Sequence, residues 1–255
     1  MSVPDIPNNR KQKELKMWER LESGKVAMAM AFFITALILR DSGLAEANDD
    51  TAVIYPSGST AVLLVDPFND FISEGGKLWN LVKESVEAVD LVPNLKRLAD
   101  GARTKGIQIV YTPHRRWREG DYENWKFLHR NHVGAAKFQV FAAGTWGGEF
   151  HPDLAPQPGD EIAKEHWLTS AFPNTDVDYI LRQHGIDHVV VVGMTTNTCV
   201  ESTARYAVEM GYHTTLLTDA VASFSMEEHN AAVNLDYPRI AHNVSTVDEF
   251  LASVE

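Results

Sequence analysis

Apolar runs alternate with amphipathic stretches through most of the chain. Ala61–Val65 is a continuous apolar run that ends at Asp66, and His188–Val192 contains four consecutive valines. Both are typical of strands buried on the two faces of a parallel sheet. Apolar residues at helical spacing over 82–105 predict a helix, with Pro93 as a kink or break. Further strands are predicted over 107–111, 161–164, 214–217 and 244–247, and further helices over 175–184, after residue 199, from about residue 226 and over 248–254.

Strands that alternate with helices of this length predict an α/β protein. We expect a doubly wound, Rossmann-like parallel sheet with helices on both faces, formed by one domain over residues 51–255. Residues 113–159 interrupt the alternation and are rich in Gly, Pro, Trp and His. Because this stretch is too long for a plain connection, we expect it to form a lid or a pocket wall.

The first fifty residues have a different pattern. Residues 8–25 are charged and helix-prone, and Val26–Leu39 is a mainly apolar run of 14 residues. That run is too short for a stable membrane span. It also resembles the apolar region of a signal peptide, with Ala45–Ala47 as a small-x-small site. We favour a helical arm over residues 1–50 and a cytoplasmic protein; if residues 1–47 act as a signal sequence, the protein is exported.

Composition narrows the choice of function. The chain has 255 residues, 44% of them hydrophobic, which is enough for one sizeable core. A single cysteine excludes an intramolecular disulfide and a zinc site built on several thiolates, and it fits a reducing compartment. The formal net charge is −12, and residues 51–255 hold 16 Lys and Arg against 27 Asp and Glu. A nucleic-acid partner is disfavoured, because phosphate binding needs a basic surface.

The one cysteine, Cys199, lies where a strand ending near Gly193 runs into a predicted helix. Asn197 and Thr198 are residues that can cap this helix. The thiol would then lie among unpaired backbone N–H groups, which favour a thiolate and bind an oxyanion. The alternative is that a lone cysteine is simply a small buried apolar residue.

Three polar residues follow predicted strands: Asp66, Lys164 and Cys199. The carboxyl ends of parallel strands meet at one edge of a doubly wound sheet. There a thiolate can attack a carbonyl carbon, a carboxylate can carry the proton to the leaving amine, and a lysine can support the developing charge. Taken singly, Asp66 also fits a turn residue and Lys164 a solvent-facing one.

Three ordered motifs strengthen this interpretation. They are Leu64–Phe71 (LVDPFNDF), Lys164 ahead of Ser170–Phe172 (SAF), and Gly193–Val200 (GMTTNTCV). Over roughly residues 60–250 the chain resembles the isochorismatase-like cysteine hydrolases, the superfamily that holds nicotinamidases and carbamoylsarcosine amidohydrolase.

The resemblance implies roles for individual residues. Asp66 corresponds to the general acid and base, Lys164 to the lysine of the triad, and Cys199 to the nucleophile. A cis peptide is implied between Met194 and Thr195. The backbone N–H groups of Thr195 and Cys199 would form the oxyanion hole.

The chain departs from the family pattern in two places. Residues 165–169 separate Lys164 from Ser170, a longer spacing than many members have. The strand end at Tyr111–Trp117 lacks the Asp of the nicotinamidase metal motif, so we expect no metal and no other cofactor. His129 and His132 are three residues apart on one helical face, and a solvated or packed pair is the favoured interpretation.

Aromatic residues near the motif ends are candidates for a flat or apolar substrate pocket, although each could equally serve packing. Arg115 or Arg116 could hold a substrate carboxylate, with a surface arginine as the alternative. The sequence does not identify the substrate. The aromatic candidates are Phe71, Trp79, His114, Trp146, Trp167 and Phe172.

A complete triad predicts a hydrolase that cleaves a C–N bond of a small amide, ureide or carbamoyl substrate through a thioester. Two alternatives remain: a non-catalytic scaffold or binding protein of the same fold, and an isochorismate-type vinyl-ether hydrolase, which needs no cysteine nucleophile. A thiol redox sensor would lack a resolving cysteine. We expect a small-molecule substrate and a homo-oligomer, either a dimer or a tetramer.

Overall fold

The structure of the chain is a computed structural model, and it describes residues 53–255. The arm expected over residues 1–50 lies outside this range. Within residues 53–255, no helix is both long and apolar enough to cross a membrane.

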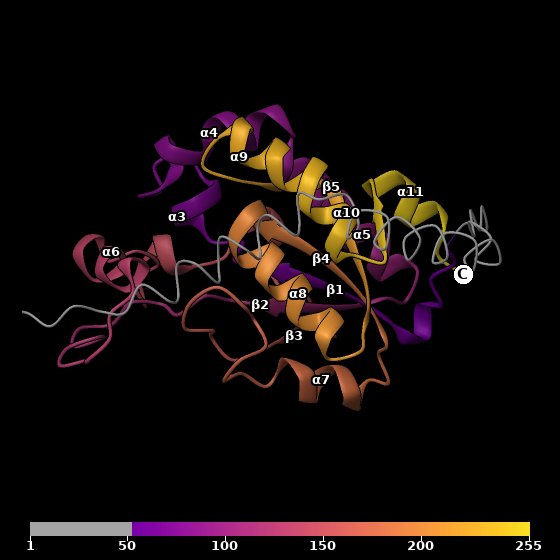
Figure 1. The fold of residues 1–255 in the computed structure, drawn as a ribbon, viewed down its shortest axis with the longest axis horizontal. Helices are drawn as coiled ribbons and strands as arrows, with labels where there is room; N and C mark the ends of the chain where they lie inside the picture. Colours follow the sequence, from indigo (N-terminus) through magenta and orange to yellow (C-terminus); the bar gives the residue numbers. More distant parts are fainter. Residues whose placement is uncertain (1–52) are drawn as a thin grey trace, which may run out of the picture. The chain divides into compact units, whose positions relative to one another are not determined.

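The described chain is built on one parallel sheet of six strands in the order β3-β2-β1-β4-β5-β6. This order reverses direction between β1 and β4, as in a doubly wound fold. The sheet and its helices confirm the predicted α/β class (Figure 1). The strands are β1 (Thr60–Val65), β2 (Gln108–Thr112), β3 (Glu161–Ile162), β4 (His188–Met194), β5 (His213–Ala222) and β6 (Asn243–Ser245).

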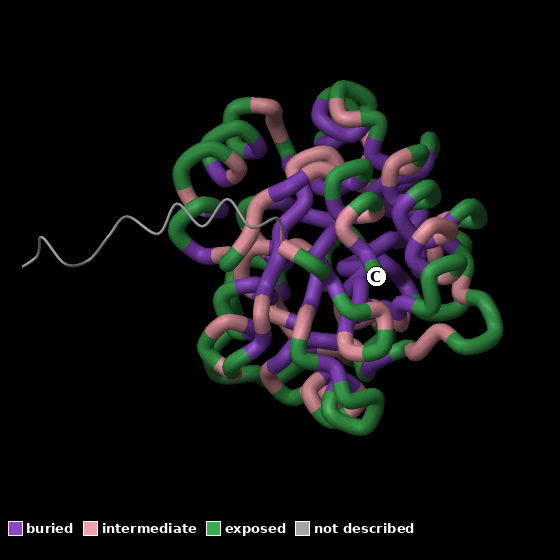
Figure 2. The backbone as a smooth tube through the Cα atoms, turned by 90° about the vertical axis from the view of Figure 1, so that its right-hand side faces the viewer, coloured by how far each residue is buried: buried purple, intermediate pink, exposed green. Residues whose placement is uncertain are grey.

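Alternating side chains of the central strands enter two separate cores. In β1, Val62 and Leu64 join one core, whereas Ala61, Leu63 and Val65 join the other, and all five are buried. Helices α4, α5 and α11 supply the first core, and α7, α8 and α10 supply the second. Figure 2 shows the buried strands enclosed by exposed loops and helix faces. The helices are α3 (Asn69–Ile72), α4 (Trp79–Ala88), α5 (Leu91–Thr104), α6 (Arg130–Phe138), α7 (Val177–Gln183), α8 (Glu201–Glu209), α9 (Met226–Ala231), α10 (Tyr237–Ile240) and α11 (Val247–Ala252).

The helical pattern over 82–105 is two helices. The break falls at Asp90, which has φ 50° in the left-handed region, rather than at Pro93. Pro93 lies in the first turn of α5. Backbone N–H groups in this turn have no acceptor within the helix, so the missing N–H of proline costs no hydrogen bond. The helix expected from residue 175 begins at Val177 instead and ends before Gly185, whose φ is 68°.

Residues 113–159 are less irregular than expected, because they contain α6, which projects from the rest of the domain at the left of Figure 1. His129 and His132 form its capping box: the ring of His129 accepts from the backbone at the helix start, and the ring of His132 accepts from the backbone N–H of His129. Two histidines three residues apart therefore cap a helix. His132 is buried, whereas His129 is exposed.

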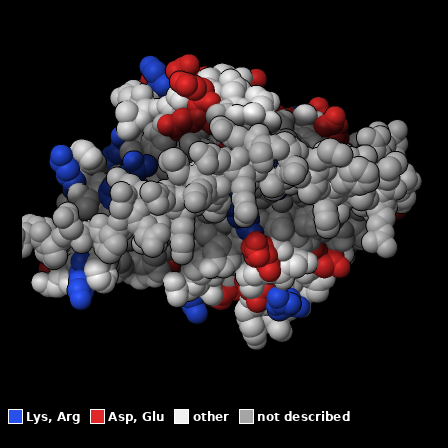
Figure 3. All heavy atoms as spheres, viewed as in Figure 1, with Lys and Arg blue, Asp and Glu red and all other residues white. Residues whose placement is uncertain are grey.

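Charged side chains on the face drawn in Figure 3 are interspersed, with basic groups beside acidic ones over the described residues. Among residues 53–255, several charged side chains form ion pairs, for example Lys96 with Asp100 and Arg182 with Asp178. Exposed pairs of this kind add little stability.

The contact between β1 and β4 is unusually close at Gly193. This residue pairs with Val65 and has φ 112°, a conformation that residues with a Cβ rarely adopt. A Cβ added there would lie 2.1 Å from the carbonyl oxygen of Val65. Only glycine therefore fits where β4 approaches its neighbour just before the Cys199 loop.

We predict that Gly193→Ala lowers the free energy of unfolding by about 3 kcal/mol or more, because it combines backbone strain with a clash against backbone atoms. Urea unfolding of the two proteins measures the difference. Gly58→Ala is the matched control, since a Cβ at Gly58 meets no atom within 4 Å. Equal midpoints for the two variants would contradict the close approach.

Candidate active site

Four adjacent strands bring polar side chains to one edge of the sheet. Asp66 follows β1, His114 follows β2, Cys199 follows β4, and His166 lies beyond the end of β3. Because these strands are parallel neighbours in the sheet, their carboxyl ends meet. The edge is also the point where the strand order reverses, the usual place for a ligand in such folds.

Asp66 is at the centre of this edge. It is 1% exposed and has φ 52°, a strained value for a residue other than glycine. Its Oδ1 accepts a hydrogen bond from the backbone N–H of His114 at 2.6 Å and lies 3.1 Å from Nε2 of His166. Both bonds go to one oxygen, so Oδ2 is left for another donor.

Cys199 lies in a π-helical turn, Thr196–Val200, directly before α8. The predicted caps do not act as caps here: no side chain caps this turn or α8, and Asn197 instead bonds to Ser223 at 2.7 Å. The thiol is 8% exposed and lies 3.9 Å from the carbonyl oxygen of Leu168. The Met194–Thr195 peptide that precedes this turn is cis.

The electrostatic environment of the thiol differs from that expected for a helix N-terminus. Burial raises the pKa of the Cys199 thiol well above its usual value, and the nearby negative charge of the Asp66 carboxylate raises it further. The backbone N–H of Thr195 acts in the opposite direction. The free protein therefore holds a thiol beside a carboxylate rather than a preformed thiolate.

Lys164 is not brought to this site, which corrects the assignment made from the sequence. Its side chain is 74% exposed, and its Nζ lies 3.6 Å from Oδ2 of Asp176. His166, which sequence reasoning missed, occupies the buried position beside Asp66 and is 0% exposed.

Lys164 follows buried Ala163 and faces outward by alternation, and a one-residue bulge beyond it decides which later residue faces Asp66. Tyr111 pairs with Ile162 and His114 pairs with His166, so the register advances by three residues along one strand and four along the other. Without the extra residue, the alternation that buries Ala163 would bring Glu165 inward. The bulge shifts the inward position to His166.

His114 completes the edge as a neutral group. Burial and the neighbouring His166 together lower its pKa to about 4, against the opposing effect of Asp66. The rings of His114 and His166 meet edge to face with centroids 5.2 Å apart. Among residues 53–255, no group of three or more His, Cys, Asp or Glu is arranged to hold a metal ion.

The aromatic candidates separate into two groups. Besides His114, Trp167 lies beside the site as the neighbour of His166. Phe71 is separated from His114 by the ring of Phe141. The centroid of the Phe141 ring lies 4.9 Å from that of Phe71 and 5.7 Å from that of His114. Phe172 is buried in the same core cluster as Cys199 and stacks on Tyr206. Trp79 packs against the other core, and Trp146 is 48% exposed. Among the described residues, no hydrogen bond, ion pair or ring contact joins either tryptophan to the four residues at the edge.

A cavity of about 400 Å³ lies between the 167–174 segment and α8. Cys199 is not part of its wall, but Leu168 is, and the carbonyl of Leu168 contacts the thiol. The cavity is therefore next to the nucleophile and one residue removed from it. Its wall consists of Trp167, Leu168, Thr169, Ser170, Pro173, Asn174, Ser202, Arg205 and Tyr206.

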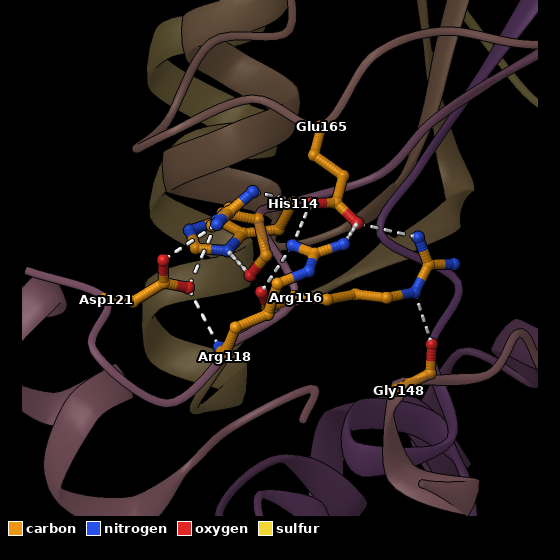
Figure 4. Close-up of polar contacts among 7 residues, drawn as sticks. His114, Arg116, Arg118, Asp121, Gly148 and Glu165 are labelled. Atoms are coloured by element: carbon orange, nitrogen blue, oxygen red, sulfur yellow. Dashed lines mark hydrogen bonds and ion pairs between the residues drawn. The ribbon is translucent and has the colours of Figure 1, made fainter. Parts of the chain in front are cut away.

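The arginines suggested for a substrate carboxylate already have protein partners (Figure 4). Arg115 binds both oxygens of Asp121, at 2.7 and 3.1 Å. Arg116 binds Glu165 at 3.0 Å and the carbonyl oxygen of Gly148 at 2.6 Å. Both arginines thus hold the 113–122 segment in place.

We predict slow alkylation of Cys199 by iodoacetamide at pH 7, with a rate that rises as the pH passes 9, because only the thiolate reacts. Asp66→Asn removes the negative charge and should raise the rate at pH 7 about tenfold or more. Asp153→Asn, on an exposed carboxylate, is the control and should change nothing. Rapid alkylation of the unmodified protein at pH 7 would contradict the raised pKa.

Comparison with known proteins places this geometry in a family. Residues 60–248 match the model of the isochorismatase domain. The chain is 30% identical over 218 residues to ureidoacrylate amidohydrolase RutB of Rhizobium rhizogenes, a match that covers 82% of this chain and 88% of that protein.

Solved structures agree with this match. A cysteine hydrolase from Pseudomonas syringae superposes with a TM-score of 0.68 at 26% identity, covering 79% of this chain and 94% of the other. N-carbamoylsarcosine amidase from Thermoplasma acidophilum gives a TM-score of 0.55 at 26% identity, covering 74% and 97%. The chain therefore belongs to the isochorismatase family.

Proposed function

We propose that this protein is a cysteine-dependent hydrolase that cleaves a C–N bond of a small amide, ureide or carbamoyl compound. The observation that carries the proposal is the placement of the Cys199 thiol beside the Asp66 carboxylate at the ends of two adjacent strands. A buried thiol with a buried carboxylate near it has the composition of a nucleophile and its base.

The first half of the reaction forms a thioester. The thiol proton of Cys199 passes to Asp66 as the sulfur attacks the carbonyl carbon, which breaks the C=O π bond and leaves a negative oxygen. The backbone N–H groups of Thr195 and Cys199 are the donors assigned to that oxygen, and the Thr195 N–H already faces the sulfur. The C–N bond then breaks, and Asp66 returns the proton to the leaving nitrogen.

The second half releases the acyl group. A water molecule gives a proton to Asp66 as its oxygen attacks the thioester carbon. The C–S bond breaks, the sulfur leaves, and Asp66 returns the proton to it, which restores the thiol. A raised thiol pKa suits this cycle, because proton transfer to Asp66 is coupled to attack and the sulfur is not charged while the site is empty.

Two relatives support the choice of bond. One is named ureidoacrylate amidohydrolase and another N-carbamoylsarcosine amidase, and both names describe hydrolysis at a nitrogen-bearing acyl carbon. A vinyl-ether hydrolase has no need of the thiol, and a non-catalytic scaffold needs neither the thiol nor the buried carboxylate. The paired arrangement therefore favours the amidohydrolase.

Release of ammonia or amine from a panel of small amides, ureides and carbamoyl compounds tests the proposal, with Cys199→Ala as the blank. We expect Cys199→Ala to abolish turnover and Cys199→Ser to be nearly inactive, because a hydroxyl is a weaker nucleophile beside the same base. Asp66→Asn should lower kcat by at least about 100-fold. Full activity in the Ala variant would rule out the thioester.

We also expect EDTA to leave turnover unchanged, since the proposed steps use only the thiol, the carboxylate and backbone N–H groups. The measurement is kcat before and after dialysis against the chelator, with added zinc or manganese as a second arm. Loss of activity that either metal restores would show that the reaction needs an ion.

A further inference from the structure

We propose that His166 is the positioning residue of the general base: it holds Asp66 through an Nε2–H···Oδ1 hydrogen bond, in the place that sequence analysis assigned to Lys164. This inference rests on the proposed function. Within residues 53–255, His166 is the only side chain that makes a hydrogen bond or ion pair with Asp66.

The backbone of His166 is fixed to the end of β2. Its N–H donates to the carbonyl oxygen of Pro113 at 2.9 Å, and its own carbonyl oxygen accepts from the N–H of Arg115 at 2.8 Å. These bonds make the bridge between His114 and His166. The backbone that carries the imidazole ring is therefore fixed by hydrogen bonds to the end of β2. Functional side chains on such rigid elements are held more precisely than those on loops.

Both sequence neighbours of His166 are held as well. Glu165 accepts from Arg116 at 3.0 Å and from Arg118 at 2.9 and 3.3 Å. Burial opposes the charged form, but the hydrogen bonds from Arg118 and Arg116 lower the pKa of Glu165, which stays ionised (Figure 4).

On the other side, the guanidinium of Arg115 lies 4.6 Å from the ring centre of Trp167, a cation–π contact. The carbonyl oxygen of Trp167 is 3.1 Å from Nε2 of His132. The residues before and after His166 are thus bound in the 113–132 region, while His166 itself is directed at Asp66. An arrangement this constrained leaves the imidazole few alternatives to the bond with the carboxylate.

The hydrogen bonds set the direction of proton transfer. Oδ1 of Asp66 is occupied by the backbone N–H of His114 and by Nε2–H of His166, so Oδ2 is the oxygen that takes the thiol proton. The groups that face the His166 ring are Asp66 and His114, and His114 is neutral. Nδ1 of His166 is buried and has no hydrogen-bond partner in the described part of the chain.

Turnover by three variants separates the two candidate residues. We expect His166→Ala to lower kcat at least about 100-fold with little change in KM, because the histidine acts through the base. His166→Gln keeps a side-chain N–H donor and should recover at least about tenfold over the Ala variant. Lys164→Ala is the matched control, two residues away and exposed, and should stay within twofold of the unmodified protein.

Added imidazole distinguishes a hydrogen-bonding role of His166 from a role in packing alone. It should raise kcat of His166→Ala and leave Lys164→Ala unchanged. The proposal is overturned if Lys164→Ala loses activity as His166→Ala does, or if His166→Ala stays active. It is equally overturned if the Ala variant is folded by circular dichroism but neither Gln nor imidazole restores turnover.

A substrate-free measurement keeps this inference separate from the proposed function. His166→Lys puts a fixed cation on Asp66, so the rate of Cys199 alkylation at pH 7 should rise about tenfold or more. Ile162→Lys, at an exposed position in β3, is the control for added charge and should leave the rate unchanged. If no amide is hydrolysed, the proposed function fails while this comparison still applies. Equal alkylation rates in His166→Lys and Ile162→Lys would contradict the proposal that residue 166 lies beside Asp66 and the Cys199 thiol.

Discussion

The pairing of β1 with β4 is the constraint on which the site depends. The two strands end side by side, and the residues that follow them carry the carboxylate of Asp66 and the thiol of Cys199. Gly193 lets the strands meet closely just before the Cys199 loop, because a Cβ there would overlap the carbonyl of Val65. The apolar strands behind this edge alternate between two cores, which anchors both strand ends, and Cys199 itself belongs to one of these cores.

Much of this fold is readable from the sequence. The valine-rich run at β4 and the apolar run at β1 are buried on both faces, so their composition carries a strong signal. The helical pattern over 82–105, predicted to kink or break at Pro93, is two helices that separate at Asp90, whose left-handed backbone conformation does not follow from its residue type. The capping box of α6 uses histidines rather than Ser or Glu, which is why residues 113–159 seemed irregular.

The site was only partly predictable, for a reason of register. Asp66 and Cys199 follow long strands whose ends the hydrophobic pattern defines well. β3 has two residues, and beyond it a bulge changes which side chain faces inward. The alternation of buried and exposed residues cannot reveal a bulge in so short a segment. The resemblance to the family also implied a lysine at this position, and Lys164 lies only two residues before His166. The one available signal was the long interval between Lys164 and Ser170.

The bulge beyond β3 also bears on how such a site changes over generations. Insertion or loss of one codon is a single mutational event, yet here it would exchange the identity of the side chain presented to Asp66 while the neighbouring strands keep their register. The lineage of this chain could therefore pass between chemically different partners for the carboxylate in one step, with no intermediate that requires two substitutions at once. A strand of two residues tolerates that event because little of the sheet depends on it.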